Sequence, residues 1–145
     1  MREDKVFVDT NIFIYSVDTN DLSKHKVAID LIDACYANQN MIISFQVVQE
    51  FINTVKKISG KKSFDLSAFC VNVLFPIWEI YPSRDLYMNG LNLQKRYKYS
   101  FYDSLIIAAA LEGNCNILYS EDLHHEQKIE SLTIINPFRK RSKIL

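Results

Sequence analysis

Two acidic residues follow short apolar runs that are typical of buried strands. Asp9 comes directly after residues 6–8, Val-Phe-Val, and Asp122 follows residues 117–119, Ile-Leu-Tyr, after a serine and another acid. Apolar runs without a polar break indicate strands that are covered on both faces. Ligands of open α/β sheets bind outside the carboxyl ends of the strands, so we expect both carboxylates at one edge of a sheet. Taken singly, each Asp is equally well explained as a helix cap or a turn residue.

Asp103 lies on a predicted helix in line with apolar residues. Ile106, Ile107 and Ala110 stand three, four and seven positions after it, so the acid extends the stripe that should face the core. The alternative is a favourable charge in the first helical turn, with Ser100 as the cap. That alternative explains the helix position but not the apolar face, where an isolated charge is costly.

Glu50 lies beside the apolar stripe of another predicted helix, toward its polar flank, so periodicity alone predicts a solvated residue. Only the other acids give it a functional interpretation. Several converging carboxylates would repel and raise one another's pKa, and a hard divalent cation such as Mg²⁺ or Mn²⁺ removes that conflict. The bound cation can activate water and stabilise charge on a phosphodiester. This chemistry suits hydrolysis of a nucleic-acid backbone.

Composition bounds the kind of protein. The 145 residues are 48% hydrophobic, with three Gly and three Pro, which excludes a disordered chain and predicts a folded domain with a real core. The formal net charge is zero, so any nucleic-acid contact must come from local patches or bound cations. Three scattered cysteines indicate no disulfide framework, and no signal peptide or bilayer-spanning stretch is evident. We expect a soluble, cytoplasmic protein without a membrane partner.

Short predicted strands alternate with predicted helices along the chain. Thr10 or Asn11 could cap the first helix, and Phe64 to Phe75 has the spacing of a helix that buries Phe64, Ala68, Val71 and Phe75. The strands are expected at residues 6–8, 41–43, 77–81, 117–119 and 133–135, and the helices at 12–17, 22–36, 45–57, 64–75, 83–97 and 100–112. The alternation predicts an α/β sandwich with a mostly parallel sheet. We expect one domain over residues 1–138 and a basic tail over 139–145.

The ordered set of these residues resembles PIN-domain ribonucleases and is most similar to the VapC-type toxins of bacterial toxin–antitoxin pairs. The resemblance spans residues 6–136 and rests on Val6 to Asn11, on Glu50, on Tyr102-Asp103 and on Leu118 to Asp122. It implies a PIN-like three-layer sandwich, a Mg²⁺- or Mn²⁺-dependent endoribonuclease, a homodimer, and inhibition by an antitoxin protein.

The resemblance also assigns roles to residues. The catalytic acids carried over are Asp9, Glu50, Asp103 and Asp122, of which Asp9, Asp103 and Asp122 are the expected metal ligands. Thr10, Asn11 and Ser120 match the accompanying polar positions, and Glu126 matches one further acid found in some relatives. The family commonly has Gly near Glu126, and its absence here puts the shape of that loop in doubt.

Lys95, Arg96 and Lys98 form a basic cluster interleaved with Tyr97 and Tyr99. Such a cluster can contact RNA phosphates and stack on bases, although most charge runs are simply solvated surface.

Three functional hypotheses remain at this point. The first is an RNA-cleaving toxin regulated by an antitoxin. The second is a PIN-like nuclease that processes RNA without an antitoxin, and the third is a catalytically silent module that binds RNA or protein. A receiver-like phosphoacceptor domain is a weaker fourth, because Asp4 is poorly placed for an acid pair with Asp9.

Overall fold

The computed structural model of the protein describes residues 4–58 and 63–139, and its centre is a six-stranded sheet. The strand order is β3-β2-β1-β4-β6-β5, and every pairing is parallel except that of β5 with β6. The strands are β1 (Val6–Val8), β2 (Met41–Ser44), β3 (Trp78–Ile80), β4 (Ile117–Tyr119), β5 (Lys128–Ile129) and β6 (Leu132–Ile135). The predicted α/β class with a mostly parallel sheet is thereby confirmed.

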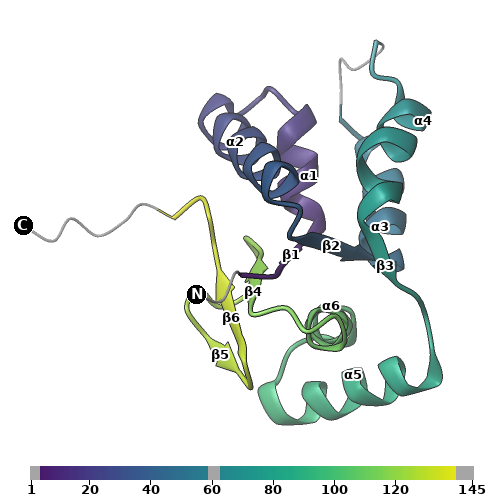
Figure 1. The fold of residues 1–145 in the computed structure, drawn as a ribbon, viewed down its shortest axis with the longest axis vertical. Coiled ribbons are helices and arrows are strands. Elements are labelled where there is room, and N and C mark those ends of the chain that lie inside the picture. Colours follow the sequence, from purple (N-terminus) through teal and green to yellow (C-terminus); the bar gives the residue numbers. More distant parts are fainter. Residues whose placement is uncertain (1–3, 59–62, 140–145) are drawn as a thin grey trace, which may run out of the picture.

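Helices cover both faces of the sheet (Figure 1). The helices are α1 (Thr10–Val17), α2 (Leu22–Asn38), α3 (Phe45–Val55), α4 (Leu66–Phe69), α5 (Arg84–Tyr97) and α6 (Phe101–Glu112). In Figure 1, α1 to α4 lie on one side of the strands, and α5 and α6 lie together on the other. This arrangement is the three-layer sandwich that we expected.

The core forms where the two helical layers meet the sheet. All three residues of β1 are buried, as are Ile42 and Ile43 of β2, so the middle strands are covered on both faces. Every residue from 104 to 110 of α6 is also buried. Because α6 is buried all round, its apolar pattern could not select the face on which Asp103 lies.

The predicted helix over residues 64–75 is wrong in its continuity and in its buried face. Only α4 is α-helical; a π-helical turn, Cys70–Leu74, and a 3₁₀ turn, Phe75–Ile77, follow it. Val71 is 60% exposed and Phe75 is 45% exposed, whereas Cys70 and Leu74 are buried. The wider π turn changes the angular spacing of the side chains, so a 3.6-residue periodicity selects the wrong positions after Phe69.

Local signals located most other helix boundaries. Ser83 and Ser100 cap α5 and α6 through their side chains, as predicted. The first helix differs, since its cap is Asp9 itself and not Thr10 or Asn11. The two-residue strand β5 had no apolar run to reveal it, and it pairs with β6 as an antiparallel neighbour.

No helix within residues 4–58 and 63–139 combines the length and the apolar composition that a bilayer crossing requires. The predicted basic tail lies outside the described residues from position 140 onward.

Gly113 generates the first testable prediction, because it ends α6 directly beneath β2. A Cβ atom at this position would lie 2.2 Å from Cδ1 of the buried Ile42. Gly113→Ala should therefore lower the free energy of unfolding by about 1–3 kcal/mol through overpacking. Ile42→Val removes the clashing methyl, so it should recover part of this loss in the double variant.

Urea unfolding of both single variants and the double variant measures this coupling. Gly90→Ala on α5 is the comparison variant, since its Cβ would lie 3.3 Å from Cδ1 of Leu105, a tight contact but a much smaller overlap than at Gly113. Strictly additive losses from Gly113→Ala and Ile42→Val would contradict the proposed clash.

Candidate active site

The pairing of β1 with β4 brings the residues that follow these two strands together. The register sets Val8 opposite Tyr119, and the N–H of Asp9 donates to the carbonyl of Tyr119 over 2.9 Å. Asp9 and Ser120 are therefore neighbours at the carboxyl edge of the sheet, where the Ser120 hydroxyl donates to Oδ2 of Asp9 at 2.8 Å. The sequence analysis predicted that Asp9 and Asp122 would lie at this edge of the sheet.

Asp9 is a buried carboxyl group, with 7% of its surface exposed. Its other oxygen, Oδ1, accepts a hydrogen bond from the backbone N–H of Thr10 at 2.7 Å, so the residue is also the cap of α1. Burial raises the pKa of Asp9 to about 7, against the lowering effect of its two hydrogen bonds, and the charges of Glu50 and Asp122 raise it further. The structure thus confirms the cap interpretation of Asp9, and its functional role stays a prediction.

Glu50 reaches the same place from α3. The Thr10 hydroxyl donates to Oε1 of Glu50 at 2.8 Å, and Nε2 of Gln46 lies 3.3 Å from Oε2. The same Gln46 nitrogen donates to the carbonyl of Tyr102 at 3.0 Å, which links α3 to the start of α6. Hydrogen bonds therefore fix the half-buried side chain of Glu50, which is not freely solvated.

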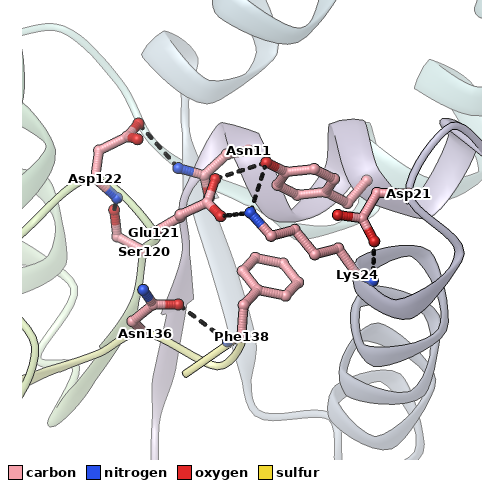
Figure 2. A network of polar contacts seen from close by, with 9 residues as sticks. Asn11, Asp21, Lys24, Ser120, Glu121, Asp122, Asn136 and Phe138 are labelled. Carbon is pink, nitrogen blue, oxygen red and sulfur yellow. Dashed lines mark hydrogen bonds and ion pairs between the residues drawn. The ribbon is translucent and has the colours of Figure 1, made fainter. Parts of the chain in front are cut away.

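Asp122 is held by α1 and by its own loop. Nδ2 of Asn11 donates to Oδ2 of Asp122 at 3.0 Å, and the backbone N–H of Asp122 donates to Ser120 Oγ at 3.2 Å. Figure 2 shows both contacts, with Glu121 turned the other way toward Lys24 on α2. The polar positions predicted from the sequence thus each contact one of the acids.

Asp103 stands in the first turn of α6, whose cap is the Ser100 hydroxyl at 3.1 Å from the Asp103 N–H. Burial raises the pKa of Asp103, and the nearby charge of Asp122 raises it further. A helix-start charge alone would be expected to have a lowered pKa. Asp103 is therefore electrostatically part of the same acidic cluster.

Polar side chains contact Asp9, Glu50 and Asp122, and the charge of Asp122 acts on both Asp9 and Asp103. Among the described residues, no three His, Cys, Asp or Glu side chains lie in an arrangement that could hold a metal ion. Glu126 makes its contacts elsewhere: its carboxylate lies 3.1 Å from Nε2 of His125, and its N–H donates to Ile134. Lys95, Arg96 and Lys98 are exposed at the end of α5, just before the turn that leads into α6.

Sequence reasoning missed Gln46, Tyr15, Lys24 and Glu121 as parts of this region. Gln46 had a usable signal, because it precedes Glu50 by one helical turn on the same helix. The other three had none, since Glu121 lies 97 residues from Lys24 and 106 from Tyr15, and only the fold makes them neighbours.

The raised pKa of Asp9 predicts how metal-free stability depends on pH. The folded-state pKa of about 7 exceeds the ordinary pKa of 3.8 for an aspartic acid, so the folded state holds the proton more tightly between these pH values. In chelator, stability should fall as pH rises from about 4 to about 7, by up to about 4 kcal/mol from this group, and then level off. Asp9→Asn keeps the shape without the charge, so it should be more stable than wild type at pH 8.

Urea unfolding at pH 5 and pH 8, with EDTA present, tests this. An Asp9→Asn variant that loses stability as steeply as wild type over this range would contradict a buried, proton-binding Asp9.

Solved structures with the same fold include several proteins of toxin–antitoxin systems. The Mycobacterium tuberculosis toxin VapC20, described as cleaving the sarcin–ricin loop, is 18% identical over 81% of this chain and 90% of its own, with a TM-score of 0.62. A toxin–antitoxin complex from Klebsiella pneumoniae is 19% identical over 92% and 98%, with a TM-score of 0.64. FitAcB from Neisseria gonorrhoeae is 15% identical over 93% of this chain and 99% of its own, with a TM-score of 0.65.

These identities are low, so the structural likeness establishes the fold alone. No curated protein sequence matches the chain. The model of the PIN domain family matches residues 6–129, which include Asp9, Glu50, Asp103 and Asp122. The chain therefore belongs to the PIN domain family.

Proposed function

We propose that this protein is a cytoplasmic, metal-dependent endoribonuclease and the toxin of a type II toxin–antitoxin pair. One observation carries the proposal: the charges of Glu50 and Asp122 act on the buried Asp9, whose pKa is raised to about 7, and the charge of Asp122 also acts on Asp103. A purely structural site would not be expected to gather like charges that destabilise one another.

The donor set fits a hard divalent cation. Asp9, Asp103 and Asp122 would hold Mg²⁺ or Mn²⁺, because carboxylate oxygens are the ligands these ions prefer. A bound cation would compensate the charges that raise the pKa of Asp9 and Asp103. When bound, it supplies activation of a water molecule and stabilisation of charge on the phosphodiester.

The chain's own side chains orient the acids. Ser120 fixes one oxygen of Asp9, and Asn11 fixes one oxygen of Asp122. Thr10 and Gln46 hold the two oxygens of Glu50, which we propose completes the catalytic set by binding or orienting water. Hydrogen bonds of this kind preorganise a site before the substrate arrives.

The substrate and partner assignments rest on relatives and on surface charge. The similar structures are described as a cleaving toxin and as toxin–antitoxin complexes, which supports an RNA substrate and an antitoxin partner for this chain. We keep the homodimer and the additional acid Glu126 as parts of the proposal. Lys95, Arg96 and Lys98 are exposed cations at the end of α5, suited to contact RNA phosphates.

Asp103→Asn tests the site. This variant should abolish RNA cleavage in Mn²⁺ and be equally or more stable than wild type in chelator, because it removes one of several repelling charges. Asp85→Asn is the matched control, since Asp85 is an exposed acid in the first turn of α5. Its variant should cleave RNA normally and lose only about 0.3–1 kcal/mol.

Cleavage of a mixed RNA substrate, paired with melting curves in chelator, measures both outcomes. An Asp103→Asn protein that is less stable in chelator yet cleaves at the wild-type rate would remove Asp103 from the site.

Expression in bacteria tests the toxin assignment separately. Induction of the wild-type chain without a partner should arrest growth and reduce intact RNA, whereas Asp103→Asn should permit normal growth at the same protein level. Normal growth with abundant wild-type protein that cleaves RNA in vitro would favour an RNA-processing nuclease. Normal growth without cleavage in vitro would favour a silent binding module.

A further inference from the structure

Glu121 and Asp122 follow the end of β4 and are held mainly by side chains. The backbone N–H of Glu121 lies 3.4 Å from Oδ1 of Asn11, whose Nδ2 donates to Asp122 at 3.0 Å. The N–H of Asp122 donates to the Ser120 hydroxyl at 3.2 Å. These side-chain contacts take the place of the backbone hydrogen bonds that a β-strand would make. The position of Asp122 therefore depends on how the side chain of the neighbouring Glu121 is held.

The carboxylate of Glu121 turns away from Asp122 and onto the two N-terminal helices. The Tyr15 hydroxyl of α1 donates to Oε1 at 2.7 Å, and the Lys24 ammonium of α2 forms an ion pair with Oε2. Lys24 Nζ also lies 3.4 Å from the Tyr15 hydroxyl. Figure 2 shows the side chain of Lys24 extending away from α2 to Glu121, and both oxygens of this carboxylate have a partner.

Aromatic rings shield the ion pair from water. The Lys24 ammonium lies 5.0 Å from the ring centre of Tyr15 and 5.6 Å from that of Phe138, and the two rings pack edge to face at 4.9 Å. The side chains of Lys24 and Glu121 are 34% and 21% exposed, compared with 78% and 65% for the surface pair Lys26–Asp30. The shielded pair is therefore the one expected to hold a fixed geometry.

We propose that Lys24 is a positioning residue for the cleavage centre: it anchors Glu121 to α1 and α2 and thereby fixes the neighbouring Asp122 at the edge of the sheet. The inference rests on the proposed ribonuclease function. Partners that orient metal-binding side chains commonly affect activity or metal affinity about 10–100-fold when they are removed. The ring of Phe138, which packs beside the Lys24 ammonium, links the segment after β6 to the same contacts.

A direct contact between Lys24 and an RNA phosphate is the competing role. Two observations favour positioning: the ammonium already faces Glu121 and Tyr15, and two rings occupy its sides. The hydrogen bond to Glu121 raises the pKa of Lys24 to about 12, so the ion pair is intact throughout the neutral pH range. The two roles predict different kinetics, because a phosphate contact contributes to substrate binding and to its salt dependence.

The experiment compares Lys24→Met, Lys24→Arg and Lys26→Met in steady-state RNA cleavage with Mn²⁺. Lys24→Met should lower kcat by about 10–100-fold with little change in KM. Lys24→Arg keeps the cation and should recover most of kcat, and Lys26→Met, which breaks the exposed pair on the same helix, should match wild type. Should Lys24→Met fail to fold, Phe138→Leu removes one ring from the ammonium and should lower kcat by a smaller factor.

Amide hydrogen exchange of the metal-free protein gives a readout that needs no RNA. Exchange at Glu121 and Asp122 should accelerate in Lys24→Met but not in Lys26→Met, because only the first variant releases the loop after β4. Unchanged exchange and unchanged kcat in Lys24→Met would overturn the positioning role while leaving the ribonuclease function in place. A raised KM with unchanged kcat and a weaker salt dependence would overturn it in favour of a phosphate contact.

A wild-type protein that cleaves no RNA in Mn²⁺ would overturn the proposed function and the role of Lys24 in it. Accelerated exchange in Lys24→Met would then still report the mechanical link between α2 and the loop.

Discussion

The parallel pairing of β1 with β4 is the constraint on which the site depends. The register that sets Val8 opposite Tyr119 forces the residues after both strands to one edge, so Asp9 and Ser120 meet. These two strands also lie where the chain order reverses within the sheet, the position at which open α/β sheets bind ligands. The buried apolar triplet of β1 fixes this geometry, because sliding it by one residue would bring Lys5 or Asp9 into one of its three buried apolar positions.

Burying a carboxylate at this edge costs free energy when no cation is bound beside it. Two hydrogen bonds offset part of the desolvation of Asp9, but its pKa still rises to about 7. The charges of Glu50 and Asp122 add repulsion at Asp9, and the charge of Asp122 adds repulsion at Asp103. Strain of this kind is characteristic of sites that bind a counter-ion or substrate.

Around the acids lies a layer of polar contacts that join elements far apart in the chain. Thr10 connects α1 to Glu50 on α3, and Asn11 connects α1 to the loop after β4. The Lys24–Glu121 ion pair adds α2 to this set (Figure 2). The helix α1 thus contacts each of these elements, which explains why its first residues, Thr10 and Asn11, are polar although Ile12 and Phe13 are buried.

The sequence by itself determined the alternation of strands and helices, the caps of α5 and α6, and the identity of the acids, because apolar periodicity and short-range capping are local properties. Tertiary structure decided the rest. The π turn at Cys70–Leu74 leaves Val71 exposed and buries Cys70 and Leu74 instead. Because α6 is buried on all sides, its apolar stripe does not identify a single buried face. Lys24 and Glu121 are 97 residues apart. Only the tertiary structure, in which α2 packs against α1, makes them partners, because no local sequence pattern relates two residues so far apart in the chain.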